Sequence, residues 1–119
     1  MKIDITYTII GTVLPGMKKG TGLGASTANL DIALAKDLPP GLYTADVKIG
    51  QKEFAGLLYY GYNSLSKTDC LEAHIFNFSE NIYGQEIEII TKRFLREPIK
   101  FKNREEMMEQ IKKDVELSK

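Results

Sequence analysis

The stretch of sequence that decides the fold of this chain is residues 43–60, YTADVKIGQKEFAGLLYY. Apolar and polar side chains alternate from Tyr43 to Ile49, which is the period of a strand with one buried face. Gly50-Gln51 then supplies a tight turn, and a second strand-like segment covers residues 53–60. The stretch therefore predicts a β-hairpin.

Further strands are predicted on both sides of this hairpin. Apolar and polar residues alternate from Ile3 to Val13, and apolar strand-forming residues dominate Leu71–Phe78 and Glu86–Phe94. Five or six strands at this spacing, with no helix between them, favour an antiparallel barrel or a sandwich. The sequence therefore predicts a body made of strands.

The C-terminal residues change from a strand period to a helical period. Asn103, followed three residues later by Glu106, is typical of the N-terminal cap of a helix. Apolar side chains then recur at helical spacing, at Met107, Met108, Ile111 and Val115. We expect a closing amphipathic helix that packs this apolar face on the barrel as part of the core.

The composition indicates one soluble domain over residues 1–119. The predicted strands place its barrel at about 1–95, which leaves about 96–119 for the C-terminal segment and helix. Hydrophobic residues make up 43% of the chain, and 16 Lys and Arg balance 16 Asp and Glu, so the net charge is zero. Such a domain does not attract nucleic acid through its overall charge.

No apolar run reaches the length of a membrane helix, and the N-terminus lacks the apolar core of a signal peptide. We expect a cytoplasmic monomer without nucleic-acid or membrane partners.

A glycine-rich segment, residues 14–29, follows the first predicted strand, and ordered loops of this length usually bind a ligand. Its residues 18–24, KKGTGLG, match neither a Walker motif nor a dinucleotide fingerprint. The glycines and lysines can still cradle phosphate through backbone N–H groups and positive charge. By composition alone, however, a segment of this kind is more often a solvated loop than a phosphate-binding loop.

Thr27 and Asn29 end this segment with a hydroxyl and an amide oxygen two residues apart. Magnesium prefers hard oxygen ligands of this kind and keeps several waters. The same residue types commonly bond their own backbone in turns, and without further context that is their more frequent role.

Glu72 is the candidate general base. Alternation along the predicted strand 71–78 places it on one face with His74 and Phe78. A carboxylate among apolar neighbours can take a proton from a substrate, although on a solvent-exposed face Glu72 would have no such role. We expect His74 to be a hydrogen-bonded structural residue and Cys70, the single cysteine, to be a small buried side chain.

An RNA-binding barrel is an alternative. Tyr59, Tyr60 and Tyr62 could stack on bases, with Lys92 and Arg93 nearby. The neutral net charge opposes this alternative, and tyrosine is common in strands for other reasons.

In their order along the chain, these motifs resemble the riboflavin kinase (flavokinase) family, as found in the kinase domain of bifunctional bacterial FAD synthetases and in monofunctional eukaryotic riboflavin kinases. The resemblance covers roughly residues 10 to 118. Its ordered blocks are GTV at 11–13, GTGLGASTANL at 20–30, PGLY at 40–43, GYN at 61–63, LEAHI at 71–75, IYGQ at 82–85, LR at 95–96, KF at 100–101, QI at 110–111 and Asp114.

The resemblance implies a fold and a reaction. The fold is a six-stranded antiparallel Greek-key β-barrel with a C-terminal helix. The reaction transfers the γ-phosphoryl group of ATP to the terminal ribityl hydroxyl of riboflavin, which gives FMN. Because no adenylyltransferase domain precedes these motifs in the sequence, we expect a monofunctional kinase.

The resemblance also implies a nucleotide site. Thr27 and Asn29 match the family's Thr-Ala-Asn and would bind Mg²⁺ and the nucleotide phosphates. The loop residues that would hold the phosphates are Lys19, Gly20, Gly22 and Gly24.

On the acceptor side, Glu72 matches the family's Glu-x-His and would take the proton of the riboflavin hydroxyl. Arg96 would belong to the flap over the flavin. Both roles agree with the needs of phosphoryl transfer, which depends on positioning, charge neutralisation and one base.

The chain departs from the family pattern in three places. The family's Phe-Pro before Thr-Ala-Asn is Ala25-Ser26, its Asn-Pro is Asn63-Ser64, and its acid two residues after Arg96 is Pro98. These departures define a second hypothesis, a catalytically degenerate relative that binds flavin or nucleotide without turnover.

Overall fold

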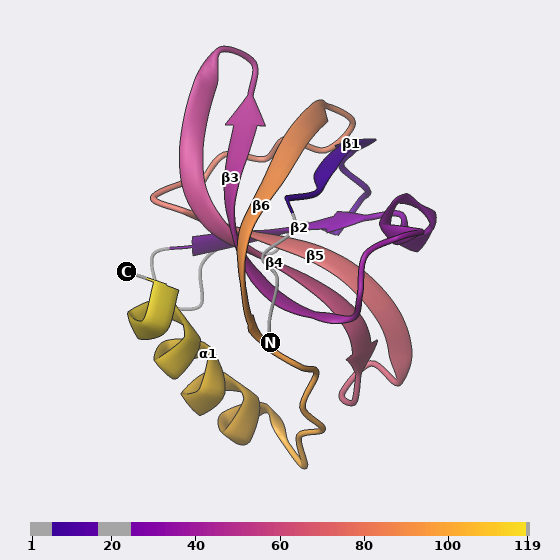
Figure 1. The fold of residues 1–119 in the computed structure, drawn as a ribbon, viewed down its shortest axis with the longest axis vertical. Coiled ribbons are helices and arrows are strands. Elements are labelled where there is room, and N and C mark those ends of the chain that lie inside the picture. Colours follow the sequence, from indigo (N-terminus) through magenta and orange to yellow (C-terminus); the bar gives the residue numbers. More distant parts are fainter. Residues whose placement is uncertain (1–5, 17–24, 119) are drawn as a thin grey trace.

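One antiparallel sheet of six strands forms the body of the protein (Figure 1). The computed structural model describes residues 6–16 and 25–118. Its elements, in chain order, are β1 (Thr8–Thr12), β2 (Ala25–Leu30), the 3₁₀ helix η1 (Ile32–Ala35), β3 (Gly41–Ile49), β4 (Lys52–Asn63), β5 (Thr68–Phe76), β6 (Glu86–Arg96) and α1 (Arg104–Ser118).

The strand order β1-β6-β3-β4-β5-β2 is that of a Greek key. Strands β3, β4 and β5 pair in sequence, and β6 returns to lie beside β3. The predicted hairpin over residues 43–60 is confirmed, because β3 and β4 pair along their length around Gly50, whose φ is 63°. Glycine adopts this left-handed conformation without steric cost.

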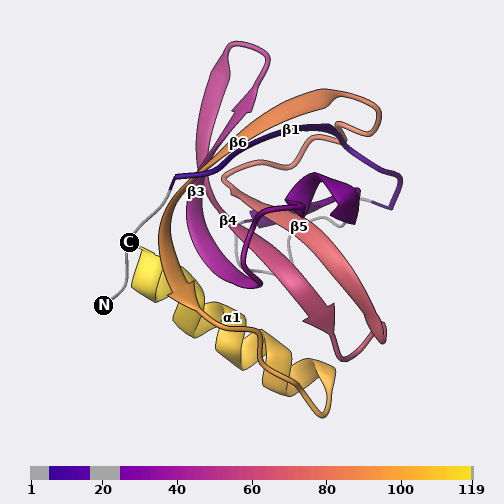
Figure 2. The same ribbon diagram turned by 45° about the vertical axis from the view of Figure 1, so that its right-hand side comes forward.

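The sheet curls into a half-barrel and does not split into a sandwich (Figures 1 and 2). Its two edge strands, β1 and β2, approach one another at one end. There Leu14, which lies just after β1, donates its N–H to the carbonyl of Asn29 in β2 at 2.8 Å. The inner face holds the hydrophobic core. Its fully buried side chains include Val47, Leu58 and Ile89.

Two sequence-based expectations about the strands are wrong. Residues 25–29 were expected in a loop but form β2, because pairing with β5 satisfies their backbone groups despite a composition typical of turns. The alternation predicts Phe78 on the same strand face as Glu72, but β5 ends at Phe76 and Asn77 takes a φ of 55°. This turn directs Phe78 into the core. There its ring packs edge-on against the ring of Phe54, with the two ring centroids 5.0 Å apart.

The predicted start of α1 is confirmed. The Glu106 N–H donates to Asn103 Oδ1 at 2.9 Å, which caps the first turn. The Glu106 carboxylate accepts the Lys102 N–H at 3.3 Å.

The expected packing of α1 is wrong. Its apolar residues are half-buried and line a pocket between the helix and the sheet, and the one buried side chain of α1 is Asp114. Figure 2 shows α1 alongside the sheet, reached by the chain that leaves β6. No helix among residues 6–16 and 25–118 is long and apolar enough to cross a membrane.

Candidate functional site

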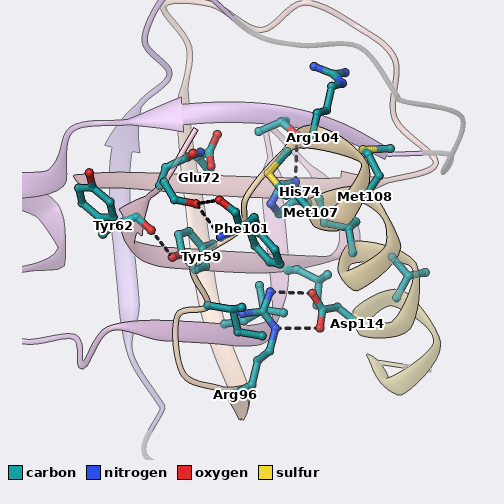
Figure 3. A pocket seen from close by; sticks show the side chains of 18 of the residues that line it. Tyr59, Tyr62, Glu72, His74, Arg96, Phe101, Arg104, Met107, Met108 and Asp114 are labelled. Carbon is teal, nitrogen blue, oxygen red and sulfur yellow. Dashed lines mark hydrogen bonds and ion pairs between the residues drawn. The ribbon is translucent and has the colours of Figure 1, made fainter. Parts of the chain in front are cut away.

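A pocket lies between the outer face of the sheet and α1 (Figure 3). Apolar side chains from both sides form most of its walls, among them Leu42 and Leu57 from the sheet and Met107 and Ile111 from the helix. The polar residues that reach it include Thr27, Glu72, His74, Arg96 and Asp114. Such a combination of apolar walls and few polar groups is typical of a small-molecule site.

The pairing of β2 with β5 assembles one side of this site. Thr27 lies opposite His74 and Asn29 lies opposite Glu72. Because side chains alternate along a strand, all four share the outer face of the sheet. The structure therefore brings together the candidate metal ligands and the candidate base. Thr27, Glu72 and His74 also line the pocket, whereas Asn29 lies outside its lining.

Glu72 is half-buried in the middle of β5. The Cys70 thiol, two residues earlier on the same face, donates to Glu72 Oε1 at 3.3 Å. Burial raises the pKa of the Cys70 thiol, and the Glu72 carboxylate raises it further, so this thiol is a neutral donor at physiological pH. The Glu72 carboxylate therefore lies on the pocket wall as a hydrogen-bond acceptor.

His74 is held by a hydrogen bond, as predicted from the sequence. Its Nδ1 lies 2.9 Å from Thr27 Oγ1. Burial lowers the pKa of His74 and Arg96 adds to this effect, while Glu72 and Asp114 oppose it. The imidazole is therefore neutral at pH 7.

Arg96 reaches α1 from the end of β6. Its Nε and Nη2 donate to the two carboxylate oxygens of Asp114 at 2.9 and 2.8 Å, and Gln110 Nε2 also donates to Asp114 at 3.1 Å. Asp114 is only 1% exposed. This bidentate pair ties α1 to the sheet across the pocket (Figure 3).

The tyrosines of β4 do not form one exposed row. The Tyr59 hydroxyl donates to the Tyr62 carbonyl at 2.7 Å, and burial is the main factor that raises the pKa of Tyr59 to about 12. Tyr60 packs against the core, so it cannot stack on a base beside Tyr62. Lys92 pairs with Asp46 at 3.4 Å. The described surface offers no row of tyrosines for single-stranded RNA.

The oxygen donors on the outer face fit a hard cation. Asn29 Nδ2 donates to the Gly16 carbonyl at 3.3 Å, which leaves the amide oxygen of Asn29 for a ligand. Within the described ranges, no group of three His, Cys, Asp or Glu side chains is placed to hold a metal. A cation here would take few protein oxygens and keep water or phosphate as its other ligands, as Mg²⁺ does.

Four of the predicted site residues, Lys19, Gly20, Gly22 and Gly24, lie outside the described residues.

The sequence did not predict the residues of α1 that line the pocket. Helical spacing assigns the apolar face of α1 to the core, but in the structure this face lines the pocket. Asp114 on this helix was the available signal, because a carboxylate seldom joins an apolar core without a cationic partner.

Comparisons with known proteins agree with this fold. A family model described as Flavokinase: Riboflavin kinase matches residues 3–119. The bifunctional riboflavin kinase/FMN adenylyltransferase of Buchnera aphidicola subsp. Schizaphis graminum is 37% identical over 120 residues, which cover 95% of this chain and 38% of that protein. The protein of the same name from Haemophilus influenzae is 36% identical over 118 residues, with the same coverage.

Two solved structures are also similar. A crystal structure titled macrolide-efflux protein, from Streptococcus pneumoniae, has a TM-score of 0.72 and 26% identity over 93% of this chain and 38% of its own. The riboflavin kinase of Trypanosoma brucei has a TM-score of 0.61 over 95% of this chain and 77% of its own, and at 21% identity it shows the fold alone.

This chain spans about two fifths of the length of the two bifunctional relatives. The family model, by contrast, matches almost every residue of the chain from Ile3 onward. The chain therefore belongs to the riboflavin kinase family.

Proposed function

We propose that this chain transfers the γ-phosphoryl group of ATP to the terminal ribityl hydroxyl of riboflavin and so produces FMN. The observation that carries the proposal is the position of Glu72. Its half-buried carboxylate stands on the wall of an apolar pocket, on the same sheet face as Thr27 and Asn29. Membership of the riboflavin kinase family supports this choice of donor and acceptor.

The apolar walls suit the flavin ring of the acceptor. Leu57 lies on the sheet side, and Met107, Met108 and Ile111 lie on the helix side. Flat aromatic ligands bind between such walls, and methionine adapts its shape to them. With the ring bound there, the ribityl chain would extend along β5 towards Glu72.

Glu72 acts as the general base in this proposal. The ribityl oxygen forms a bond to the γ-phosphorus while the bond from that phosphorus to the β–γ bridging oxygen breaks. The hydroxyl proton passes to Glu72, and ADP leaves with the bridging oxygen. No covalent enzyme intermediate is needed, so catalysis depends on positioning and electrostatics.

Thr27 and Asn29 would hold Mg²⁺ together with the ATP phosphates. When bound, the cation neutralises negative charge on the phosphates. In the tautomer whose Nδ1 carries no proton, His74 accepts a hydrogen bond from the Thr27 hydroxyl. The lone pairs of the Thr27 oxygen then remain available for a ligand. The phosphate-holding roles of Lys19, Gly20, Gly22 and Gly24 remain predictions from the family resemblance.

Arg96 contributes to the acceptor site through Asp114. Its guanidinium is engaged by this carboxylate, so we assign it the role of holding α1 over the flavin. The cytoplasmic location and the monomeric state of the protein remain predictions.

The test is a chromatographic assay of the purified protein with riboflavin, ATP and Mg²⁺. We expect FMN from the wild type and from Glu86→Gln, an exposed control at the far end of β6, and none above background from Glu72→Gln. A wild type that binds riboflavin but produces no FMN with any nucleotide or divalent metal would contradict the proposal. That result would support the second hypothesis, a binding protein without turnover.

A further inference from the structure

The segment that joins β6 to α1, residues 97–103, forms part of the pocket wall; we call it the strap. Ile99 and Phe101 of the strap line the pocket, and Figure 3 shows the Phe101 side chain among the lining residues. The strap has no regular secondary structure, so its position depends on contacts with its surroundings. Two such contacts come from the end of β4 and the turn after it.

Ser64 makes the polar contact. Its hydroxyl accepts the Phe101 N–H at 2.8 Å and donates to the Phe101 carbonyl at 3.1 Å. One side chain therefore satisfies both backbone groups of a residue that is 37 positions away in the sequence. Because both residues are half-buried, water does not freely replace these bonds.

Gly61 and Pro98 make the apolar contact. Gly61 has a φ of 153°, and a Cβ atom placed on it would lie 2.9 Å from Pro98 Cγ. The strap thus rests directly on the backbone of β4. A residue without a side chain is required there.

These anchors coincide with two of the departures from the family pattern. In the resemblance drawn from the sequence, Ser64 matches a proline of the family pattern and Pro98 matches an acid. Proline has no hydroxyl and could not form the two bonds to Phe101. Both departures therefore act on the same segment of the pocket wall.

We propose that Ser64 is a positioning residue for the flavin acceptor: its hydroxyl fixes the Phe101 backbone and holds the strap as a preformed wall of the pocket. The inference rests on the proposed function, since it names riboflavin as the ligand of this pocket. A wall that is ordered before binding spares the ligand the entropic cost of ordering it. Ser64 follows the end of β4, where Asn63 pairs with Thr68, whereas Thr27 and Asn29 pair with His74 and Glu72 further along β5. We therefore expect ATP binding not to depend on Ser64.

The test compares Ser64→Ala with Ser64→Thr, which keeps a hydroxyl, and with Ser66→Ala, an exposed serine on the same turn. Riboflavin binding is measured by quenching of flavin fluorescence, which requires no turnover. Loss of the two bonds in Ser64→Ala should raise the Kd and the KM for riboflavin by about three- to tenfold. The KM for ATP and the kcat at saturating riboflavin should stay within about twofold, and Ser64→Thr should restore most of the affinity.

Pro98→Ala provides a second variant, because it loosens the strap at its other anchor and leaves the sheet intact. It should also raise the Kd for riboflavin. The inference is overturned if Ser64→Ala and Pro98→Ala, folded by circular dichroism, bind riboflavin as tightly as the wild type. An equal loss of ATP and riboflavin affinity would also overturn it, because that result indicates a general structural role.

Failure of the inference is distinguishable from failure of the proposed function. A wild type that binds riboflavin without producing FMN contradicts the kinase proposal, while the comparison of Ser64 variants by fluorescence still decides the inference. A wild type that does not bind riboflavin contradicts both.

Discussion

Arg96 and Asp114 form a bidentate ion pair between the end of β6 and the middle of α1, with N···O distances of 2.9 and 2.8 Å. The carboxylate is almost fully buried, whereas the Arg96 side chain is 18% exposed. This pair is a polar link between the helix and the sheet on the pocket side, and Arg93 Nη2 of β6 makes another link when it donates to the Leu117 carbonyl at 2.8 Å. The helix can therefore cover a pocket without filling it.

Removal of Asp114 should detach α1. Asp114→Ala leaves a partly buried guanidinium without its partner, which costs about 2–4 kcal/mol in the docking of the helix. Hydrogen exchange of the α1 amides should accelerate accordingly, and the affinity for riboflavin should fall. Glu109→Gln breaks an exposed pair with Lys112 at 3.7 Å and should change exchange little. Unchanged α1 protection in Asp114→Ala would show that packing alone holds the helix.

Replacement of Glu72 should separate binding from chemistry. Glu72→Gln keeps the size and hydrogen-bonding capacity of the side chain but cannot take the hydroxyl proton. We expect the kcat to fall by about 10²- to 10⁴-fold, while the Kd for riboflavin changes by less than about threefold. Steady-state assays with fluorescence titrations measure the two effects. A kcat near the wild-type value would refute the role of Glu72 as base.

Thr27 and Asn29 should affect the metal requirement. Each substitution, Thr27→Ala or Asn29→Ala, removes one hard oxygen from the outer face of β2, so the Mg²⁺ concentration for half-maximal activity should rise several-fold. Riboflavin affinity should be nearly unchanged. Thr12→Ala, an exposed position in β1, is the matched control. An unchanged Mg²⁺ dependence in both variants would contradict the assignment of these ligands.

His74 should make stability depend on pH. Burial lowers its pKa in the folded protein, whereas the unfolded chain titrates near the ordinary value of about 6.5. As the pH falls through this value, the unfolded state takes up a proton that the folded state does not, so the free energy of unfolding decreases. His74 is the single histidine. Urea denaturation of His74→Gln should therefore show a smaller loss of stability between pH 7 and pH 5 than the wild type.

Carboxylates near His74 also influence the pH dependence. Glu72 on β5 and Asp114 on α1 raise the pKa of His74, while Arg96 on β6 and burial lower it. The prediction therefore concerns the difference between the two proteins. Parallel curves for wild type and His74→Gln would indicate that the imidazole titrates alike in both states.

Ser26, which matches a proline in the resemblance drawn from the sequence, should stabilise β2. Its side chain is 1% exposed, and its hydroxyl donates to the Phe78 carbonyl at 2.5 Å. Ser26→Ala leaves this carbonyl without its partner and should lower the free energy of unfolding by about 1–3 kcal/mol. Urea denaturation measures the effect, and Ser66→Ala is the exposed control. No loss of stability would mean that water replaces the bond.

Much of this protein is determined by local patterns in its sequence. Alternation over residues 43–60 specifies the β3–β4 hairpin, and Asn103 with Glu106 marks the start of α1. The order and spacing of the motifs also point to the riboflavin kinase family, which the family model over residues 3–119 shows. These features depend on neighbours along the chain, so they can be read from the sequence.

The assembly of the site was decided only by the tertiary structure. Residues 25–29 have the composition of a turn, and it is their pairing with β5, more than 40 residues later, that makes them a strand and places Asn29 opposite Glu72. Helical spacing shows that the apolar residues of α1 share a face, but not what this face contacts. The Arg96–Asp114 pair and the Ser64–Phe101 bonds hold that face over a pocket. Local periodicity specifies which side chains share a face, whereas long-range pairing decides what lies opposite them.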